Sequence, residues 1–307
     1  SPDCATQTAV TLSQQGGSGG TTSVTATYGQ PMPKITIPTR TGYDFQGYYT
    51  ANGGTGTKYY NADGTSAKNW DKEDATFTLI AYWKAKTYTV TLNNQGATTA
   101  GATSVTATYN AAMPSIASNL PKKTGYVFQG YFDAISGGTK YYNADGTSAK
   151  NWDKTSATTL YAQWTCETPE FDIKIKDDNP VVFSGEPIEL TIVGSNIATD
   201  ATYQWYKGNE EIANQNSATL TIEEWDANDI GNYACEVSNG TCSEINNYTV
   251  KMYSLRGLID WETDCIFERA TATTATYSTE LYANASYDFK IFDGSDYYGN
   301  TGADPTM

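Results

Sequence analysis

The sequence predicts a mainly β protein built from consecutive modules, and three observations lead to this prediction. A block of seventeen residues, GTKYYNADGTSAKNWDK, occurs at 56–72 and again at 138–154. The 24 Tyr and 27 Gly, with frequent Thr and Val, suit half-buried strands joined by tight turns. No long segment shows the apolar period of a helix. A chain of 307 residues has room for about two to four modules.

The duplication extends well beyond the repeated block. TSVTATY recurs at Thr22–Tyr28 and Thr103–Tyr109, and TGY…FQGY recurs at Thr41–Tyr48 and Thr124–Tyr131. Corresponding residues lie 80 to 83 positions apart, so residues 9–165 form two similar units. Near-identical tandem units more often lengthen a molecule or multiply a weak contact than carry two active sites. We therefore expect a modular spacer in this half of the chain.

Each unit is expected to contain four strands separated by turns. In the first unit these strands are Val10–Leu12, Val24–Tyr28, Phe45–Tyr49 and Phe77–Trp83. The Gly-rich stretch Gln14–Gly20 forms a hairpin between the first two, and Asn61–Gly64 forms a tight turn because Asp and Gly tolerate the backbone conformation needed there. Residues 65–72 are expected to form a single helical turn. The second unit follows the same course to Trp164.

The aromatic residues of the units have two interpretations, stacking on a glycan or filling a core. They are Tyr48, Tyr49, Tyr59, Tyr60 and Trp70, with Tyr131, Tyr141, Tyr142 and Trp152 in the second unit. We favour the core, because a unit of about 80 residues has few other large side chains and each ring buries about 150–250 Å². Strand alternation predicts that one ring of each Tyr-Tyr pair points inward and the other outward. Trp70 and Trp152 are expected at equivalent buried positions.

Charge is distributed unevenly along the chain. Residues 1–165 carry 12 Lys and Arg against 9 Asp and Glu, a balance of +3, whereas residues 166–307 carry 7 against 25, a balance of −18. The change indicates a domain boundary near Cys166. Because no basic stripe exists, we expect no nucleic-acid partner, and the acidic half is interpreted as a soluble surface. No apolar run approaches the roughly 18 residues that span a membrane, so we expect no membrane-spanning segment.

The sequence lacks most of the side-chain combinations used in catalysis. It contains no histidine, which removes the usual general base, the commonest metal ligand and every Ser-His or Cys-His pair. It has no phosphate-binding loop, dinucleotide fingerprint or CxxC pair. Carboxylate pairs remain an alternative, since Asp and Glu are abundant, but no spacing singles one out. We expect no enzyme activity, no catalytic residue, no cofactor and no metal site.

The motifs of residues 9–165 carry a family resemblance. The order VTL…GG…TSVTATY, TGY…FQGY, GTKYY, Trp and a closing aromatic strand resembles the Listeria–Bacteroides repeat, also called the internalin-type B repeat. The resemblance covers both units. It implies a small β-grasp-like fold that occurs in arrays in secreted or surface-attached bacterial proteins and acts as a spacer or adhesive module.

Residues 171–253 show a second pattern. The segment Pro187–Val193 alternates as a strand, Trp205 lies within Tyr203–Lys207, and Tyr233 stands two residues before Cys235. These motifs resemble the core Trp and tyrosine corner of an immunoglobulin-like domain. The resemblance implies a partner cysteine near Leu190 or Ile192, where the sequence has none, so the usual disulfide between the two sheets is excluded.

A different disulfide is predicted in this segment. Cys235 and Cys242 flank a hairpin with Asn239-Gly240 at its tip, which places the two cysteines on one face of neighbouring strands. We predict that they form a disulfide, with two free thiols as the alternative. Because the chain has five cysteines, one stays unpaired, and Cys265 is the candidate.

The last segment, residues 254–307, begins a further unit. Its YDFKI…DYYGN order loosely resembles β-sandwich modules of Sus-type starch-binding outer-membrane lipoproteins. The resemblance implies that Trp261, Tyr297 and Tyr298 are glycan-binding candidates, and packing within the module is the alternative interpretation. The segment is short for a sandwich, so it is expected to be a partial one.

Together these observations predict four domains arranged end to end. They are a first β-grasp-like repeat at 1–86, a second at 87–166, an immunoglobulin-like domain at 167–253 and a partial β-sandwich at 254–307. We expect a monomeric, non-catalytic, extracellular or outer-surface bacterial protein that acts in adhesion or as a spacer displaying other domains. Its partner would be a host or bacterial surface protein or a glycan. The alternatives are a glycan-binding accessory protein, with its site in the C-terminal module, and the non-catalytic part of a glycan-degrading enzyme.

Overall fold

The computed structural model describes residues 6–176, 187–225 and 227–250, together with the backbone of short strands between 254 and 299. Strands dominate these residues, which confirms the mainly β prediction. The chain divides into two compact units, residues 1–122 with 128–164 and residues 123–127 with 165–307. Two short 3₁₀ turns are described, η1 (Asn52–Gly54) and η3 (Ala227–Asp229). Among the described residues no helix has the length and apolar content to cross a membrane.

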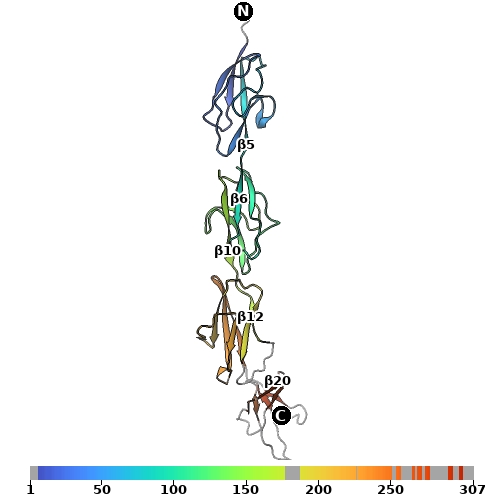
Figure 1. The fold of residues 1–307 in the computed structure, drawn as a ribbon, viewed down its shortest axis with the longest axis vertical. Helices are drawn as coiled ribbons and strands as arrows, with labels where there is room; N and C mark the ends of the chain where they lie inside the picture. The colour runs from blue at the N-terminus through green and yellow to red at the C-terminus, as the bar shows by residue number, and fades with distance from the viewer. Residues whose placement is uncertain are drawn as a thin grey trace, which may run out of the picture. The chain divides into compact units, whose positions relative to one another are not determined.

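The two repeats form sheets of the same design (Figure 1). The first sheet has the order β2-β1-β5-β3-β4 and the second has the order β7-β6-β10-β8-β9. The strands of the first are β1 (Gln7–Ser13), β2 (Ser23–Thr27), β3 (Tyr43–Tyr49), β4 (Lys58–Tyr60) and β5 (Thr76–Ala85). Those of the second are β6 (Thr87–Asn93), β7 (Ser104–Thr108), β8 (Tyr126–Phe132), β9 (Lys140–Tyr142) and β10 (Thr158–Cys166).

The first and last strands of each repeat are direct neighbours and run parallel. The register of β1 and β5 runs from Ala9↔Thr76 to Ser13↔Ile80, and β6 pairs with β10 in the same way. The pairs β1–β2, β3–β4, β3–β5, β6–β7 and β8–β9 are antiparallel. Because a parallel pair needs a long crossover, the chain between β1 and β5 has room to supply the rest of the sheet and the loops that cover it.

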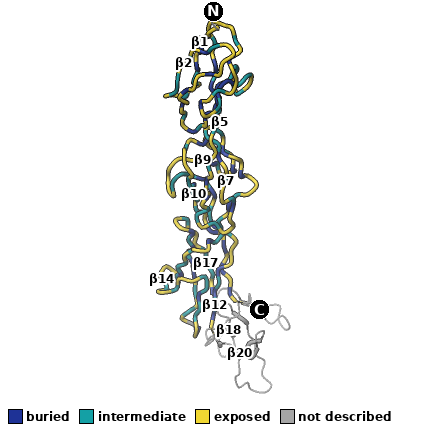
Figure 2. The backbone as a smooth tube through the Cα atoms, turned by 45° about the horizontal axis from the view of Figure 1, so that its top comes forward, coloured by how far each residue is buried: buried dark blue, intermediate teal, exposed yellow. Residues whose placement is uncertain are grey.

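Strand alternation decides which side chains enter the core. Along β1 every second residue is buried, so Val10 and Leu12 face inward while Thr11 faces solvent (Figure 2). Phe45, Tyr48 and Trp83 add aromatic rings in edge-to-face contacts 5.2–5.4 Å apart. The core of each repeat is therefore largely aromatic, as the sequence predicts.

Two local expectations for the repeats are wrong. Tyr59 and Tyr60 are adjacent on β4, yet both are fully buried. Tyr60 contacts Tyr48, and Trp70, from the following loop, packs against Tyr59 at a ring separation of 4.9 Å, so both tyrosines belong to one core. The same loop is not helical at 65–72, because Ser66 forms an extended bridge with Tyr60.

The compact unit that contains residues 165–307 includes a two-sheet sandwich. Its sheets have the orders β11-β12-β15 and β14-β13-β16-β17. The strands are β11 (Phe171–Ile175), β12 (Ile188–Gly194), β13 (Thr202–Lys207), β14 (Glu210–Glu211), β15 (Thr219–Ile222), β16 (Gly231–Asn239) and β17 (Cys242–Val250). Trp205 is fully buried between the sheets, beside Leu190 and Cys235. The Tyr233 hydroxyl donates to the Asp229 carbonyl at 2.8 Å, so the tyrosine corner inferred from the sequence is present.

Further strands are described beyond the sandwich by their backbone alone. They are β18 (Ser254–Arg256), β19 (Cys265–Ile266), β20 (Glu268–Thr271), β21 (Thr274–Thr276), β22 (Lys290–Phe292) and β23 (Tyr297–Gly299). Four of them form a sheet of order β19-β18-β22-β23, and β20 pairs with β21. The identification of this segment as a partial sandwich module stays a prediction.

Candidate functional site

The three glycan-binding candidates are not tested by the structure. Trp261 lies outside the described residues. Tyr297 and Tyr298 lie in β23, where the backbone pairs with Phe292 and Ile291 of β22. Alternation along a strand still allows only one of the two tyrosine rings to face a given side of that sheet. Their role in glycan binding remains a prediction.

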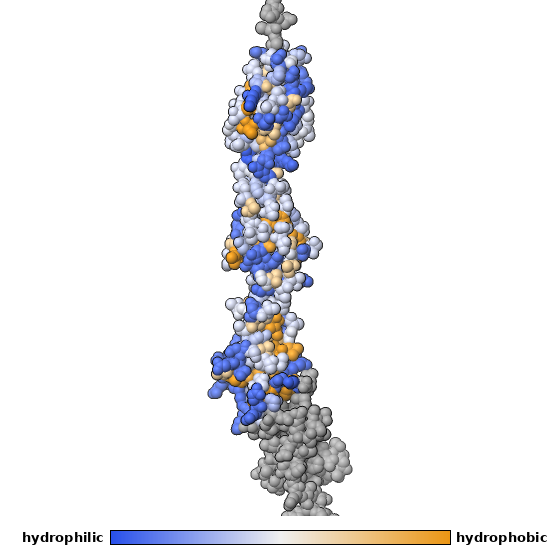
Figure 3. Space-filling model, viewed as in Figure 1, coloured by the Kyte–Doolittle hydropathy of each residue, from blue (hydrophilic) through white to orange (hydrophobic). Residues whose placement is uncertain are grey.

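The aromatic residues shared by the repeats are not displayed as a sugar platform. Tyr48, Tyr59, Tyr60 and Trp70 are 0% exposed, and their counterparts Tyr131, Tyr141, Tyr142 and Trp152 are 0–1% exposed. This confirms that they form cores and that the two tryptophans occupy equivalent buried positions. On the face drawn in Figure 3, apolar surface is divided into small patches. Exposed apolar side chains include Ile135, Val193 and Ile245.

Hydrogen bonds explain why polar residues of the repeated block accompany these rings. The hydroxyl of Tyr59 donates to Asp71, which also pairs with Lys68, and Tyr141, Asp153 and Lys150 repeat the arrangement. Burial raises the pKa of the Tyr59 phenol, and the bond to Asp71 raises it further. The bond from Lys68 and then that from Tyr59 lower the pKa of Asp71. At neutral pH the phenol is therefore neutral and the carboxylate charged, which is the pairing that holds the loop on the core.

The Asn-Ala-Asp-Gly turns of the two repeats are likewise closed internally. Asp63 accepts hydrogen bonds from the backbone N–H of Thr65 at 3.0 Å and from its hydroxyl at 2.6 Å. Asp145 and Thr147 repeat both bonds. These bonds lower the pKa of each Asp. Within the described part of the chain, no group of three or more His, Cys, Asp or Glu residues is placed to hold a metal ion.

The predicted disulfide between Cys235 and Cys242 is wrong, because the structure joins Cys242 to Cys166. The hairpin pairs Asn239 with Cys242, which places Cys235 opposite Asn246. Asn246 and Cys242 are four residues apart along β17, which corresponds to about 13 Å. The Cα atoms of a disulfide lie about 4.4–6.8 Å apart, so Cys235 is too far from Cys242 to pair with it. The Cα atoms of Cys166 and Cys242 are 5.9 Å apart.

Topology explains why Cys166 and Cys242 meet. Cys166 precedes β11 and Cys242 begins β17, and the Asn246 side-chain amide donates to the carbonyl of Phe171, the first residue of β11. The two strands are therefore adjacent where β11 begins, which brings the residues before them together. The closed loop spans 76 positions. In the chain-entropy model a loop of this length contributes about 4.5 kcal/mol to stability.

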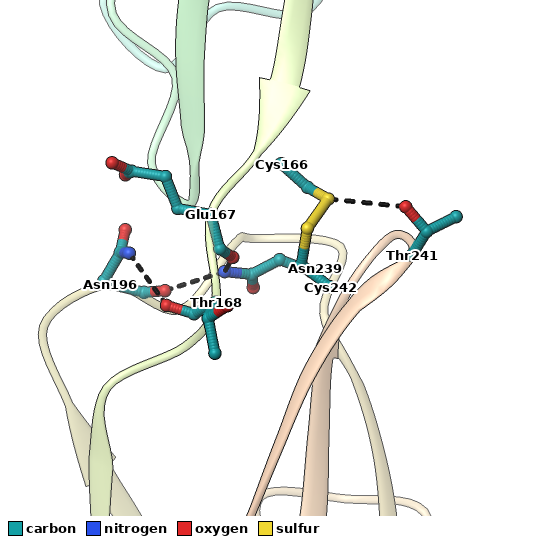
Figure 4. Close-up of a disulfide and its surroundings, with 7 residues drawn as sticks. All are labelled: Cys166, Glu167, Thr168, Asn196, Asn239, Thr241 and Cys242. Atoms are coloured by element: carbon teal, nitrogen blue, oxygen red, sulfur yellow. Dashed lines mark hydrogen bonds between the residues drawn. A yellow bond between two sulfur atoms is a disulfide. The ribbon is translucent and has the colours of Figure 1, made fainter.

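A buried amide organises the chain around the disulfide (Figure 4). The Asn239 side chain donates from Nδ2 to the carbonyls of Glu167 at 3.0 Å and Asn196 at 2.8 Å. Its Oδ1 accepts from the Ala198 backbone N–H at 2.8 Å. Asn239 is 0% exposed, so each of these bonds satisfies a group that water does not reach. We call Cys166, Cys242, Glu167, Asn196 and Asn239 the disulfide cluster.

Asn196 extends the disulfide cluster to a turn in the same compact unit. Its Oδ1 accepts from the backbone N–H of Gly125 at 3.1 Å, and its Nδ2 donates to Thr168. The Glu167 backbone N–H donates to the Gly125 carbonyl at 2.8 Å. A Cβ at Gly125 would lie 2.7 Å from the Asn239 amide nitrogen, so glycine is required by this close approach as well as by its φ of +79°. The sequence pattern places Asn239 only at the tip of a hairpin and does not single out Asn196.

Cys235 is a free, fully buried thiol. It lies across the strand pair from Trp205, and burial raises the pKa of its thiol to about 12. A thiol in this environment stays protonated and behaves as a small apolar side chain. Cys4 lies outside the described residues, and only the backbone of Cys265 is described.

Family models support the two resemblances found in the sequence. The Listeria–Bacteroides repeat domain matches residues 9–77 and 88–163, and the immunoglobulin domain matches residues 169–239. The chain thus carries Listeria–Bacteroides repeats in tandem and an immunoglobulin-like domain. The resemblance of residues 254–307 to Sus-type modules stays a prediction.

A curated relative shares part of this organisation. Internalin H of Listeria monocytogenes is 33% identical over 163 residues, which is 53% of this chain. The chain spans 24% of the length of that relative. The match therefore links this chain to an internalin without covering most of the internalin.

Solved structures give only weak matches. The amphioxus IgVJ-C2 molecule is 17% identical, covering 29% of this chain and 48% of that chain with a TM-score of 0.24. The N-terminal four Ig domains of Dscam1 isoform 8.4 are 14% identical, covering 80% of this chain and 73% of that chain with a TM-score of 0.27. Scores this low support no conclusion about this chain.

Proposed function

We propose that this chain belongs to a non-catalytic bacterial cell-surface or secreted protein, in which the tandem repeats and the immunoglobulin-like domain act in adhesion or as a spacer that displays other domains. One observation carries the proposal. The aromatic residues of the block that is identical in both repeats are all buried. Selection for folding is enough to keep such residues, whereas a binding site keeps side chains that a ligand can reach.

The polar residues of the same block support this interpretation. Asp63 and Asp71 of the first repeat, and Asp145 and Asp153 of the second, bond to groups of their own repeat. The polar side chains of the block are therefore used inside each repeat, which is what a spacer made by duplication requires. The match to an internalin supports a surface or secreted location.

The partner proposed for the protein is a host or bacterial surface protein or a glycan, bound by a monomer. Glycan binding through Trp261, Tyr297 and Tyr298 is the alternative function, and it rests on the sequence alone. The same holds for a role as the non-catalytic part of a glycan-degrading enzyme.

Two experiments test the proposed function. Protease added to intact source cells, or to their culture medium, should release peptides of this chain, and recovering them only after lysis would contradict the location. The full chain should also be applied to a glycan array and to immobilised host matrix proteins.

A shortened chain tests whether the second repeat contributes to binding. Deleting residues 85–165 joins Lys84 to Cys166 and leaves one complete repeat in register, since Ala85 and Cys166 follow Trp83 and Trp164 at the same spacing. Affinity in solution for any array or matrix hit should survive this deletion. Loss of binding would assign the contact to the repeats, and turnover of an array glycan would contradict a non-catalytic role.

A further inference from the structure

The position of the disulfide has a mechanical consequence. Cys166 precedes the first strand of the sandwich, β11, and Cys242 is the first residue of its last strand, β17. Residues 167–241 contain all the remaining strands of the sandwich, β11 to β16, and therefore lie inside the covalent loop. Only residues 243–250 of β17 separate the loop from the residues that follow the sandwich.

We infer that the Cys166–Cys242 bond carries tensile load past the immunoglobulin-like domain, so that the domain transmits force without lengthening. The inference rests on the proposed function, since a spacer between a bacterial surface and its target is pulled from both ends. Force entering at Cys166 crosses the two sulfurs to Cys242 and continues along β17. Residues 167–241 are outside this path.

The strand that completes the path is already extended. β17 runs from Cys242 to Val250, and a strand rises about 3.4 Å per residue against a maximum of about 3.6 Å for a stretched chain. Pulling β17 straight, or stripping it from β16, adds only about 2 Å over its eight steps. With the bond intact, unfolding of the sandwich therefore releases almost no length.

Without the bond the result is different. The two cysteines are 76 positions apart in sequence but 5.9 Å apart between Cα atoms. Stretched at roughly 3.3–3.6 Å per residue, the freed segment reaches about 250–270 Å. The disulfide thus prevents nearly all of this length from being extended.

The repeats resist tension through hydrogen bonds between strands and not through a disulfide. The sequence has no cysteine between Cys4 and Cys166, and in each repeat the first and last strands pair in parallel, β1 with β5 and β6 with β10. Tension pulls the start of β1 and the end of β5 in opposite directions along their common axis. The bonds between the two strands are then sheared together, which resists force better than opening them one at a time. Both kinds of module are arranged to bear load.

Single-molecule stretching of the full chain tests the inference. The chain is held by handles at its two ends and extended in oxidising buffer, beside the double variant Cys166→Ser, Cys242→Ser. Both proteins should release length when the repeats unfold. The double variant should show one additional release of about 250–270 Å, because the freed segment now extends.

A second arm uses the wild-type chain and dithiothreitol. Reduction transfers two electrons and two protons from the dithiol to the disulfide, giving two protein thiols and the cyclic disulfide of the reagent. The additional release should then appear in the wild-type chain, while traces of the double variant stay unchanged. This arm starts from folded wild-type protein, so it holds even if the double variant folds poorly.

The outcomes are decisive in both directions. The additional release in either the double variant or the reduced chain, together with its absence in the oxidised chain, supports the inference. The release in the oxidised chain, or its absence from both other samples, overturns it. Surface exposure is measured independently on intact cells, so failure of the load path is distinguishable from failure of the proposed location.

Discussion

A natural substitution between the repeats gives the sharpest test of how their cores are stabilised. In the first repeat the indole N–H of Trp70 donates to the Thr8 hydroxyl at 2.9 Å, and that hydroxyl donates to the Asp74 carbonyl at 2.6 Å. Thr8 is 0% exposed. The second repeat has Tyr88 at the position of Thr8, and the buried indole nitrogen of Trp152 finds no hydrogen-bond partner among the described residues.

The perturbation is Thr8→Val, which keeps the shape of the side chain and removes its hydroxyl. It leaves the Trp70 N–H buried without an acceptor, as at Trp152. An unsatisfied buried donor costs about 1–3 kcal/mol. The matched control is Thr11→Val, the same change on the exposed face of the same strand, which should alter the free energy of unfolding by less than about 0.5 kcal/mol.

Hydrogen exchange measured by mass spectrometry on the full chain reads out this difference locally. Peptides from β1 and β6 differ in sequence and so report on the two repeats separately. Thr8→Val should speed exchange in β1 by about 5- to 150-fold, which corresponds to about 1–3 kcal/mol, and leave β6 unchanged. Equal exchange in the Thr8→Val and Thr11→Val chains would refute the reasoning, because it would show that the hydroxyl contributes nothing at the buried position.

Four further predictions follow from the same structure. Trp70→Ala should cost about 3–5 kcal/mol in the free energy of unfolding, with Trp152→Ala at the lower end of this range, and denaturant titration would expose an error if either left the transition unchanged. A non-reduced digest should contain the Cys166 and Cys242 peptides joined, with Cys235 alkylated only after unfolding; a Cys235–Cys242 linkage would count against the structure. The pKa of Asp71 is lower in the folded state than in the unfolded state, where it is near 4. Its contribution to stability is therefore present above the unfolded-state pKa and is lost as the pH falls through the folded-state pKa. Asp71→Asn should accordingly reduce the loss of stability on acid titration. The end-to-end order expected from the sequence predicts a radius of gyration above the compact value of roughly 19 Å, and small-angle scattering at that value would argue against it.

The sequence predicts those features that depend on local pattern. The alternation around Val10 and Leu12 is sufficient to place β1, and the spacing of Tyr233 and Cys235 is sufficient to find the tyrosine corner. A duplicated aromatic block in a small unit correctly indicates a core, because the unit has few other side chains large enough to fill it.

Features that depend on which distant segments meet are not readable from the pattern. Tyr59 and Tyr60 are both buried because the loop after their three-residue strand brings Trp70 against Tyr59, and alternation alone does not reveal this contact. The pairing of Cys242 depends on where β11 begins relative to β17. Its one signal in the sequence is that Cys166 stands a few residues before the sandwich, on the chain that enters it. Cys235 is closer to Cys242 in sequence than Cys166 is, but it is farther from Cys242 in space.

The differences between the repeats show how a duplicated core tolerates change. In the first repeat the Trp83 indole donates to the Gln14 carbonyl at 2.9 Å, while the buried Tyr48 hydroxyl has no partner among the described residues. In the second repeat the equivalent tyrosine, Tyr131, donates to the Asn94 side chain at 2.7 Å, and it is the Trp164 indole that lacks a partner.

Asn94, the counterpart of Gln14, has a side chain that is shorter by one methylene, and its Oδ1 accepts the hydrogen bond from the Tyr131 hydroxyl. Both amides also bond to the neighbouring hairpin, since Gln14 donates to the Gly20 carbonyl at 3.1 Å and Asn94 donates to the Ala102 carbonyl at 3.3 Å, but only Asn94 accepts from a tyrosine. Each repeat therefore leaves one of these two polar groups unsatisfied, at a similar expected cost of about 1–3 kcal/mol. Because the aromatic rings themselves do not move from the core, the apolar contacts that dominate the stability of each unit are preserved. Drift of this kind is permitted where sequence is selected to fold, which is the condition expected of a spacer.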